Sequence, residues 1–183
     1  MRLTSNKLAP TFSSTSLNGE KFNLSKPRNK LLLLAFFRYA SCPLCNLRVH
    51  ELIENYHALK DNIDIIAVFQ SPAEKINQYV GKQSISFYVL PDPDKKLYRL
   101  YGVESSWFGF AKAWTIKISQ VFDAVFKHRY LPGSVEGELN RIPADFIIGT
   151  DNKIIRAYYG NDIGDHLPLA EIHQLVKSHE AGQ

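Results

Sequence analysis

Short apolar runs alternate along the chain with segments whose apolar residues recur at helical spacing. Residues 31–37 (LLLLAFF) form an unbroken apolar run, and residues 63–69 (IDIIAVF) are almost as apolar. Both runs predict strands that are buried on two faces. From Leu44 to Leu59 most apolar positions are three or four residues apart, which predicts a helix. Strands that alternate with helices in this way predict an α/β fold around a central sheet.

Turn and capping signals predict the remaining elements. Residues 11–26 predict a hairpin with Asn18 and Gly19 at its tip. Ser71 is expected to be the N-cap of a helix, with Glu74 completing a capping box. Further strands are expected at 85–92, 144–149 and 153–160, and further helices at 93–103 and 168–179.

One segment departs from this alternation. Residues 107–128 predict an amphipathic helix, and we expect one domain over residues 1–183 with an inserted helical segment at about 104–140. A helix that covers the sheet is the favoured interpretation, with a partner or membrane-surface helix as the alternative. A dimer interface also suits so aromatic a face. Its apolar residues are Trp107, Phe110, Ala111, Trp114, Ile118, Val121, Phe122, Val125 and Phe126.

Composition and charge exclude several classes of protein. The chain has 183 residues, 45% of them apolar, and a formal net charge of +4. Its 22 Lys and Arg residues are scattered, so nucleic-acid binding is not expected. No stretch approaches the roughly 20 apolar residues of a membrane span, and the N-terminus has no apolar signal region. We therefore expect a cytoplasmic protein with no membrane partner.

Both cysteines of the chain directly follow the first apolar run. Cys42 is expected near the N-cap of the next helix, Pro43 at its first position and Cys45 in its first turn. The free N–H groups and the dipole of a helix N-terminus stabilise a thiolate, and two thiols at this spacing can close a disulfide. Arg38 and Arg48 are near enough in sequence to add positive charge.

The spacing of the two cysteines favours redox chemistry over metal binding. In a reducing compartment, a C-x-x-C pair within a strand–helix–strand context is typical of a thioredoxin-type site. A structural zinc site needs four ligands, and the six histidines provide no second ligand pair. We expect no metal and no other cofactor.

Four stretches spread over almost the whole chain resemble peroxiredoxin-like proteins of the alkyl hydroperoxide reductase/thiol-specific antioxidant family. They are LAPTFSSTSLNGEKFNLS, LLLLAFFRYASCPLCNL, FYVLPDPDKKLYRLYGV and IPADFIIGTDNKIIRAYYG. The resemblance implies a thioredoxin fold with a central mixed sheet flanked by helices. It also implies an antioxidant oxidoreductase that reduces peroxides or disulfides and is itself reduced by a dithiol such as thioredoxin or by glutathione.

The chain departs from the family pattern at its active-site landmarks. The pattern P-x-x-x-T/S-x-x-C places the peroxide-reacting cysteine on Cys45, but Cys42 then replaces the Thr or Ser, and Arg38 replaces the Pro. The family's Arg before the following strand falls on Pro143. Pro143 instead resembles the cis-proline that lies beside the dithiol of thioredoxins.

Two mechanisms with opposite assignments follow from the resemblance. In the first, Cys42 is the exposed nucleophile that attacks a disulfide, and Cys45 resolves the mixed disulfide. In the second, peroxide oxidises Cys45 to a sulfenic acid, and Cys42 condenses with it. The second mechanism needs a positive charge, which Arg38, Arg48 or Arg141 would supply.

Several acidic residues outside the dithiol motif are candidates for other roles. Asp92 is expected in a turn or helix cap. Asp162, Asp165 and His166 are expected in turns and caps, with a metal or acid–base role as the alternative. Asp145 lies in an apolar strand, so we expect it to be exposed at an edge or to tune the thiols.

A non-enzymatic alternative uses the same features. The chain could be a redox-sensing or partner-binding protein that uses the predicted helix at 107–128. Loss of oligomerisation on replacing Trp114 by a polar residue would support this alternative, and an unchanged monomer mass would count against it.

Overall fold

A five-stranded mixed sheet forms the centre of the protein. The computed structural model describes residues 1–108, 110–111, 123–130 and 132–180. The strands are β3 (Leu31–Phe36), β4 (Ile63–Phe69), β5 (Tyr88–Pro91), β6 (Ala144–Ile148) and β7 (Ile154–Tyr159), in the order β5-β4-β3-β6-β7. β3, β4 and β5 are parallel, whereas β6 is antiparallel to both β3 and β7. The predicted α/β architecture with a central mixed sheet is confirmed.

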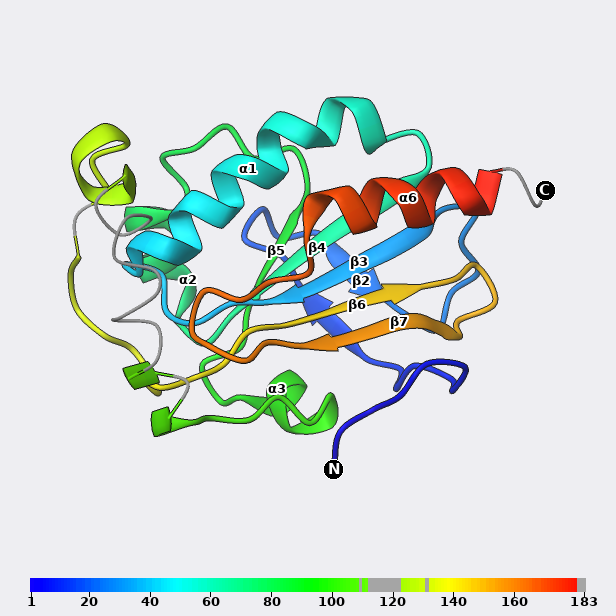
Figure 1. Cartoon of the computed structure of the whole chain (residues 1–183), viewed down its shortest axis with the longest axis horizontal. Coiled ribbons are helices and arrows are strands. Elements are labelled where there is room, and N and C mark those ends of the chain that lie inside the picture. The colour runs from blue at the N-terminus through cyan, green and yellow to red at the C-terminus, as the bar shows by residue number, and fades with distance from the viewer. Residues whose placement is uncertain (109, 112–122, 131, 181–183) are drawn as a thin grey trace.

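Helices cover both faces of this sheet (Figure 1). Helix α1 (Pro43–Leu59) and helix α6 (Leu169–Glu180) lie together on one face, and helix α3 (Lys96–Leu100) lies on the other. The apolar pattern explains this arrangement, because alternate residues of β3 enter two separate cores. Leu33 belongs to the core beneath α1 and α6, and Leu34 to the core beneath α3.

The N-terminal hairpin is present where the turn signal predicted it. β1 (Ser13–Thr15) pairs antiparallel with β2 (Lys21–Asn23). Gly19 at its tip has φ of +81°, a conformation that glycine adopts without strain. The predicted capping role of Asp92 is confirmed, because its carboxylate accepts the backbone N–H groups of Lys96 and Leu97 at the start of α3.

One predicted helix cap is wrong. Helix α2 (Ala73–Tyr79) has Pro72 as its N-cap, with no hydrogen bond from a capping side chain. The Ser71 hydroxyl accepts the backbone N–H of Ala40 at 2.8 Å and donates to Glu136 at 3.0 Å. A tertiary contact thus takes the hydroxyl that the sequence assigned to a local cap.

Only the ends of the predicted 107–128 helix can be described. Residues 109 and 112–122, which include Trp114, lie outside the described residues. Trp107 and Phe108 are 67% and 80% exposed. Asp123–Lys127 form a π-helix, η1, in which Phe126 is 72% exposed. The amphipathic helix and the inserted-segment boundary remain predictions.

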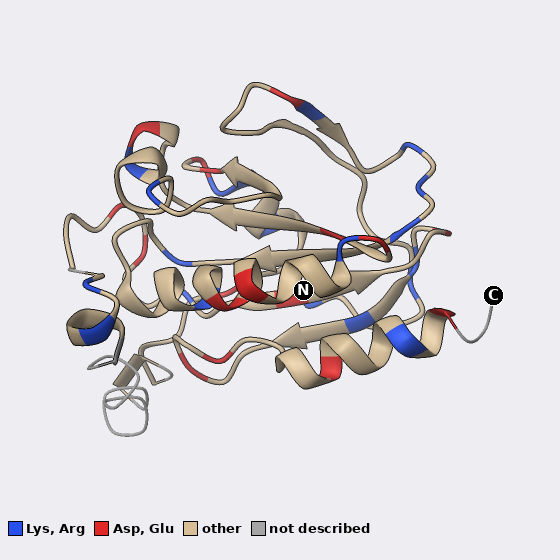
Figure 2. Ribbon diagram, turned by 90° about the horizontal axis from the view of Figure 1, so that it is seen from above, with Lys and Arg blue, Asp and Glu red and all other residues tan. Residues whose placement is uncertain are grey.

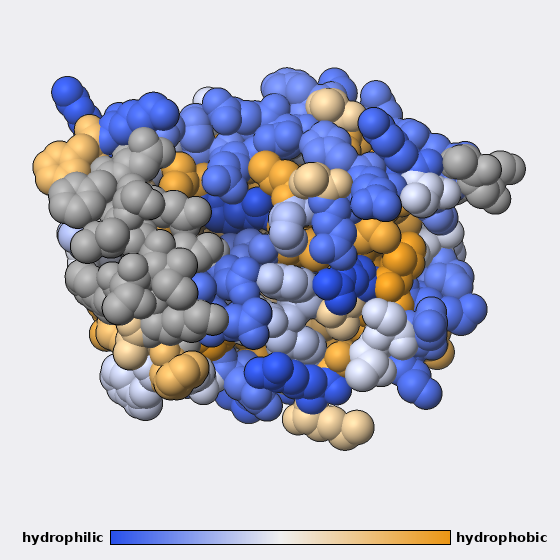
Figure 3. Space-filling view, viewed as in Figure 1, coloured by the Kyte–Doolittle hydropathy of each residue, from blue (hydrophilic) through white to orange (hydrophobic). Residues whose placement is uncertain are grey.

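Charged residues of both signs are interspersed along the ribbon (Figure 2). The face seen in Figure 3 is mostly hydrophilic, with separate hydrophobic patches. Among the helices in the described part of the chain, none is long and apolar enough to cross a bilayer.

Candidate active site

The dithiol lies where β3 leads into α1. Cys42 is the N-cap of α1, Pro43 occupies the first turn, and the Cys42 Sγ atom accepts the backbone N–H of Cys45 at 3.4 Å. Both cysteines are free thiols. The predicted placement of Cys42, Pro43 and Cys45 at a helix start is therefore confirmed, and the helix terminus directs an N–H group at the Cys42 sulfur.

The expectation that Cys42 is exposed is wrong. Cys42 is 1% exposed and Cys45 is 2% exposed. Both belong to the apolar core beneath α1, against which Phe110 and Leu139 also pack. The sequence placed the thiols at a strand-to-helix boundary, but distant residues cover that boundary in the folded chain.

The two thiols differ in acidity. Burial raises the pKa of Cys42, but the Cys45 thiol, the Arg38 charge and the backbone N–H groups of Cys45 and Leu44 together lower it to about 6. Burial raises the pKa of Cys45 well above its usual value, and the thiol's hydrogen bond to Cys42 and the charge on Cys42 raise it further. These effects make Cys42 the more acidic of the two thiols.

Arg38 is the cation of this site. Its Nη1 atom donates to Cys42 Sγ at 3.4 Å, and its Nε atom donates to the Leu139 carbonyl at 3.1 Å. The guanidinium carbon lies 4.9 Å from the centre of the Tyr39 ring. Arg38 is 3% exposed, so its charge acts on Cys42 with little screening by water.

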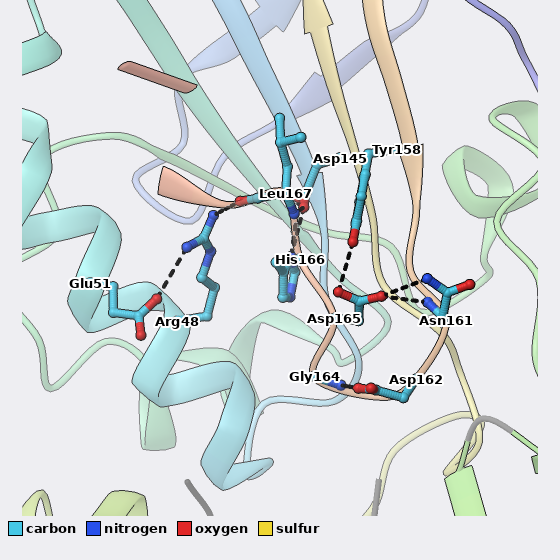
Figure 4. Close-up of polar contacts among 10 residues, drawn as sticks. All are labelled: Arg48, Glu51, Asp145, Tyr158, Asn161, Asp162, Gly164, Asp165, His166 and Leu167. Carbon is cyan, nitrogen blue, oxygen red and sulfur yellow. Dashed lines mark hydrogen bonds and ion pairs between the residues drawn. The ribbon is translucent and has the colours of Figure 1, made fainter. Parts of the chain in front are cut away.

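The other two arginines proposed from the sequence bind elsewhere. Arg48 pairs with Glu51 at 3.1 Å and donates to the Leu167 carbonyl at 2.6 Å (Figure 4). Arg141 pairs with Glu138 at 2.8 Å and donates to the Val103 carbonyl at 2.6 Å. Their hydrogen bonds are structural, so of the three arginines it is Arg38 that the structure brings to the thiolate.

Pro143 lies at the same end of the sheet as the dithiol but is not a cis-proline. Its neighbour Ala144 pairs with Phe36, the last residue of β3, and the Pro143 carbonyl accepts the N–H of Gly160 at 3.0 Å. There is no cis peptide bond in the described ranges. The trans form is the usual state of an X–Pro bond, and the sequence motif alone does not determine the isomer.

Asp145 is neither at an edge nor unpaired. It is 1% exposed in β6, where its carboxylate lies 3.0 Å from His166 Nδ1 and accepts the N–H of Leu167 at 2.6 Å (Figure 4). The Asp162 carboxylate accepts the Gly164 N–H at 2.9 Å, and the Asp165 carboxylate accepts the Asn161 N–H at 2.8 Å. These are the turn and cap contacts expected of both residues.

The histidine contact was not predicted, because His166 is 21 residues from Asp145. Within the residues that the structure describes, there is no group of three or more His, Cys, Asp or Glu side chains that could hold a metal ion. The Asp145–His166 pair instead joins the loop before α6 to the central sheet.

The structure also adds residues that sequence reasoning missed. The Leu139 carbonyl accepts a hydrogen bond from Arg38, which is 101 residues away in the sequence. The Ser134 carbonyl accepts one from Ser41, which is 93 residues away. A backbone carbonyl can come from any residue type, so no side-chain motif could have indicated these contacts. Tyr39 lies in the stretch LLLLAFFRYASCPLCNL, but only the structure shows that its ring packs against the Arg38 guanidinium.

Comparisons with known proteins agree with this architecture. The model of the AhpC/TSA family matches residues 6–157. Peroxiredoxin Bcp of Escherichia coli K12 is 28% identical over 125 residues, which cover 67% of this chain and 80% of the relative.

Solved structures show the same fold. Peroxidoxin BcpB of Mycobacterium tuberculosis superposes with a TM-score of 0.68 at 12% identity, over 100% of this chain and 99% of the other. The exposed lipoprotein thioredoxin Etrx1 of Streptococcus pneumoniae gives a TM-score of 0.60 at 20% identity, over 92% and 99%. The central sheet, the helix that begins at the dithiol and the match to the family model all agree. The chain is a thiol-dependent oxidoreductase with a thioredoxin fold and belongs to the AhpC/TSA family.

Proposed function

We propose that this protein reduces small hydroperoxides, with Cys42 as the nucleophile and Cys45 as the resolving thiol. The contact between Arg38 and the Cys42 sulfur carries this assignment. It accompanies a Cys42 pKa of about 6, lowered against the effect of burial by Cys45, Arg38 and backbone N–H groups. Because the thiolate is the reactive form of cysteine, Cys42 is better suited to attack than Cys45.

The chemistry balances with these two residues and an external reductant. The Cys42 thiolate attacks the terminal peroxide oxygen, so that an S–O bond forms, the O–O bond breaks, and the leaving alkoxide takes a proton from water. The Cys45 sulfur then attacks the Cys42 sulfenic acid, forming the disulfide while the hydroxide leaves with the Cys45 proton as water. Two thiol groups of the reductant then supply two electrons and two protons, which restore both thiols while the reductant forms its own disulfide.

Burial of Cys42 supports a small oxidant. Cys42 is 1% exposed, so any oxidant must pass the covering residues; hydrogen peroxide needs the smallest opening, whereas a protein disulfide would have to displace those residues. Reduction of disulfides is the second candidate. The observation in its favour is the dithiol itself, with an acidic Cys42 at the helix start and a protonated Cys45 one turn later.

The electron donor and the assembly belong to this proposal as well. A dithiol protein such as thioredoxin, or glutathione, would reduce the disulfide in the reducing cytoplasm. The exposed Trp107, Phe108 and Phe126 side chains support an association of two copies at the inserted segment. A redox sensor without turnover is the non-enzymatic alternative, and the absence of catalytic peroxide consumption would favour it.

Rapid mixing of the fully reduced protein with hydrogen peroxide tests the assignment. We expect wild type and Cys45→Ser to be oxidised far faster than a free thiol of equal pKa, and Cys45→Ser to accumulate a sulfenic acid detectable by mass spectrometry. Cys42→Ser should lose the fast reaction. The reverse pattern would make Cys45 the peroxide-reacting residue. Slow oxidation of all three proteins, with rapid reduction of a model disulfide by wild type, would favour the second candidate.

A further inference from the structure

A strap from the segment between η1 and β6 crosses the dithiol loop. The strap comprises residues 134–139, all of which the structure describes. In Figure 1 this part of the chain passes the end of the sheet at which α1 begins. Its neighbours there are the loop that follows β3 and the residues that follow β4.

Three side chains from these neighbours bind the strap. The Ser41 hydroxyl donates to the Ser134 carbonyl at 2.6 Å. The Ser71 hydroxyl donates to the Glu136 carboxylate at 3.0 Å, and the Gln70 amide donates to the Glu138 carbonyl at 2.7 Å. Ser41, Ser71 and Gln70 are each at most 1% exposed, so the donor side of each hydrogen bond is buried beneath the strap.

The last strap residue holds the cation of the active site. The Leu139 carbonyl accepts both Nε and Nη2 of Arg38, which leaves Nη1 to meet Cys42 Sγ at 3.4 Å. The Leu139 side chain packs against the core that contains both cysteines. The strap therefore orients Arg38 and lies on the loop that carries Cys42.

Gly137 allows the strap to lie this close. It has φ of +84°, and a Cβ atom built on it would lie 2.7 Å from Cδ of Gln70. The Gln70 side-chain amide is the group that donates to the Glu138 carbonyl. A larger residue at position 137 would be strained at this φ and would displace that amide from the strap.

The outer side of the strap is anchored as well. The Glu138 carboxylate pairs with Arg141 at 2.8 Å and with Lys95 at 3.2 Å, and it accepts the hydroxyl of Ser105. These contacts join the strap to the α3 region and to the residues before β6. The strap is held closed from both sides.

We propose that the strap determines substrate size: it fixes Arg38 and closes over Cys42, so that hydrogen peroxide reacts rapidly and bulky aryl or lipid hydroperoxides are excluded. This inference rests on the proposed peroxidase function and names the class of substrate. The oxygen attacked by Cys42 must come within bonding distance of a sulfur on a residue that is 1% exposed. A large group attached to that oxygen would contact the strap.

The test compares oxidation rate constants for hydrogen peroxide and cumene hydroperoxide. We expect wild type to favour hydrogen peroxide by at least about tenfold. Ser41→Ala removes one strap hydrogen bond, and Gly137→Ala places a Cβ against the Gln70 amide that binds the Glu138 carbonyl. Each should lower the ratio of the two rate constants by about threefold to tenfold, the effect of one lost hydrogen bond.

Matched controls separate strap opening from general destabilisation. Gly19→Ala is the control for Gly137→Ala. Gly19 has φ of +81°, nearly equal to that of Gly137, but a Cβ atom built on it has no neighbouring atom within 4 Å. Ser178→Ala removes a serine hydroxyl that binds the Gln174 carbonyl at 2.9 Å, in α6. Both controls should keep the wild-type ratio.

Each outcome decides the inference. A lower ratio in the strap variants alone supports it; Ser41→Ala decides the point if Gly137→Ala does not fold. Equal rate constants in wild type, an unchanged ratio in the strap variants, or equal changes in the controls would overturn it. If Cys42→Ser loses fast oxidation but the strap variants keep the wild-type ratio of rate constants, the role of the strap is rejected and the proposed function stands. Fast oxidation of Cys42→Ser would instead reject the proposed function, in which Cys42 is the nucleophile.

Discussion

The guanidinium of Arg38 lies against the sulfur of Cys42, with Nη1 at 3.4 Å from Sγ, and both residues are almost fully buried. A buried thiolate requires a compensating cation and hydrogen-bond donors. Arg38 provides the charge, and α1 provides the backbone N–H groups. The acidity of Cys42 depends on keeping this geometry.

Arg38→Met should raise the pKa of Cys42 from about 6 toward the value of an ordinary thiol. Burial already acts to raise this pKa, and the substitution removes a charge that opposes it. The midpoint of alkylation by iodoacetamide as a function of pH measures the change. Arg48→Met is the matched control, because Arg48 binds Glu51 and Leu167; an equal shift in both variants would contradict the assignment of Arg38.

Cys45→Ala and Cys45→Ser should differ in their effect on Cys42. The Cys45 thiol donates a hydrogen bond that opposes the effect of burial on the Cys42 pKa. Alanine removes the donor, so the alkylation midpoint of Cys42 should rise. Serine keeps a donor at the same position, so the midpoint should stay closer to wild type. Identical midpoints in the two variants would show that the side-chain hydrogen bond is unimportant.

The reduced protein should become more stable between pH 6 and pH 9. The pKa of Cys42 is about 6 in the folded protein, lowered from a usual value near 9.0 despite burial. Folding therefore favours the thiolate; the stabilisation is complete above the unfolded pKa and is lost as pH falls through the folded pKa. The upper limit of this effect is about 4 kcal/mol. Urea unfolding of reduced wild type and Cys42→Ser should show the rise in wild type alone.

Asp145→Ala should destabilise the fold by about 1 to 3 kcal/mol, the usual effect of leaving a buried hydrogen-bond donor without its acceptor. The carboxylate accepts the Leu167 N–H at 2.6 Å and contacts His166 at 3.0 Å, and Asp145 and Leu167 are buried. Urea denaturation measures the change. Asp151→Ala, at an exposed turn, should change the free energy of unfolding far less. Similar losses in the two variants would argue against a structural role for the Asp145 pair.

The regular elements follow directly from the sequence. The apolar runs at 31–37 and 63–69 became β3 and β4, and the helical spacing after Leu44 became α1. Local periodicity is enough here, because an element that must bury one or both faces shows this need in its own residues. For the same reason, the position of the dithiol at a helix start could be predicted.

Local signals failed where a side chain had a competing partner. Ser71 matched a capping box but binds Ala40 and Glu136 instead, and Pro143 matched a cis-proline but is preceded by a trans peptide bond. In both cases the motif describes what a residue can do in isolation. The surrounding fold determines which contact has the lower free energy.

The sequence by itself determined the fold class, the position of the cysteine pair at a helix start and a set of three candidate arginines. The tertiary structure alone selected Arg38 from that set, buried both thiols and made Cys42 the more acidic one. The physical reason is that charge and burial act through space. The Leu139 carbonyl that orients Arg38 comes from 101 residues along the chain, and a backbone carbonyl leaves no mark in the sequence.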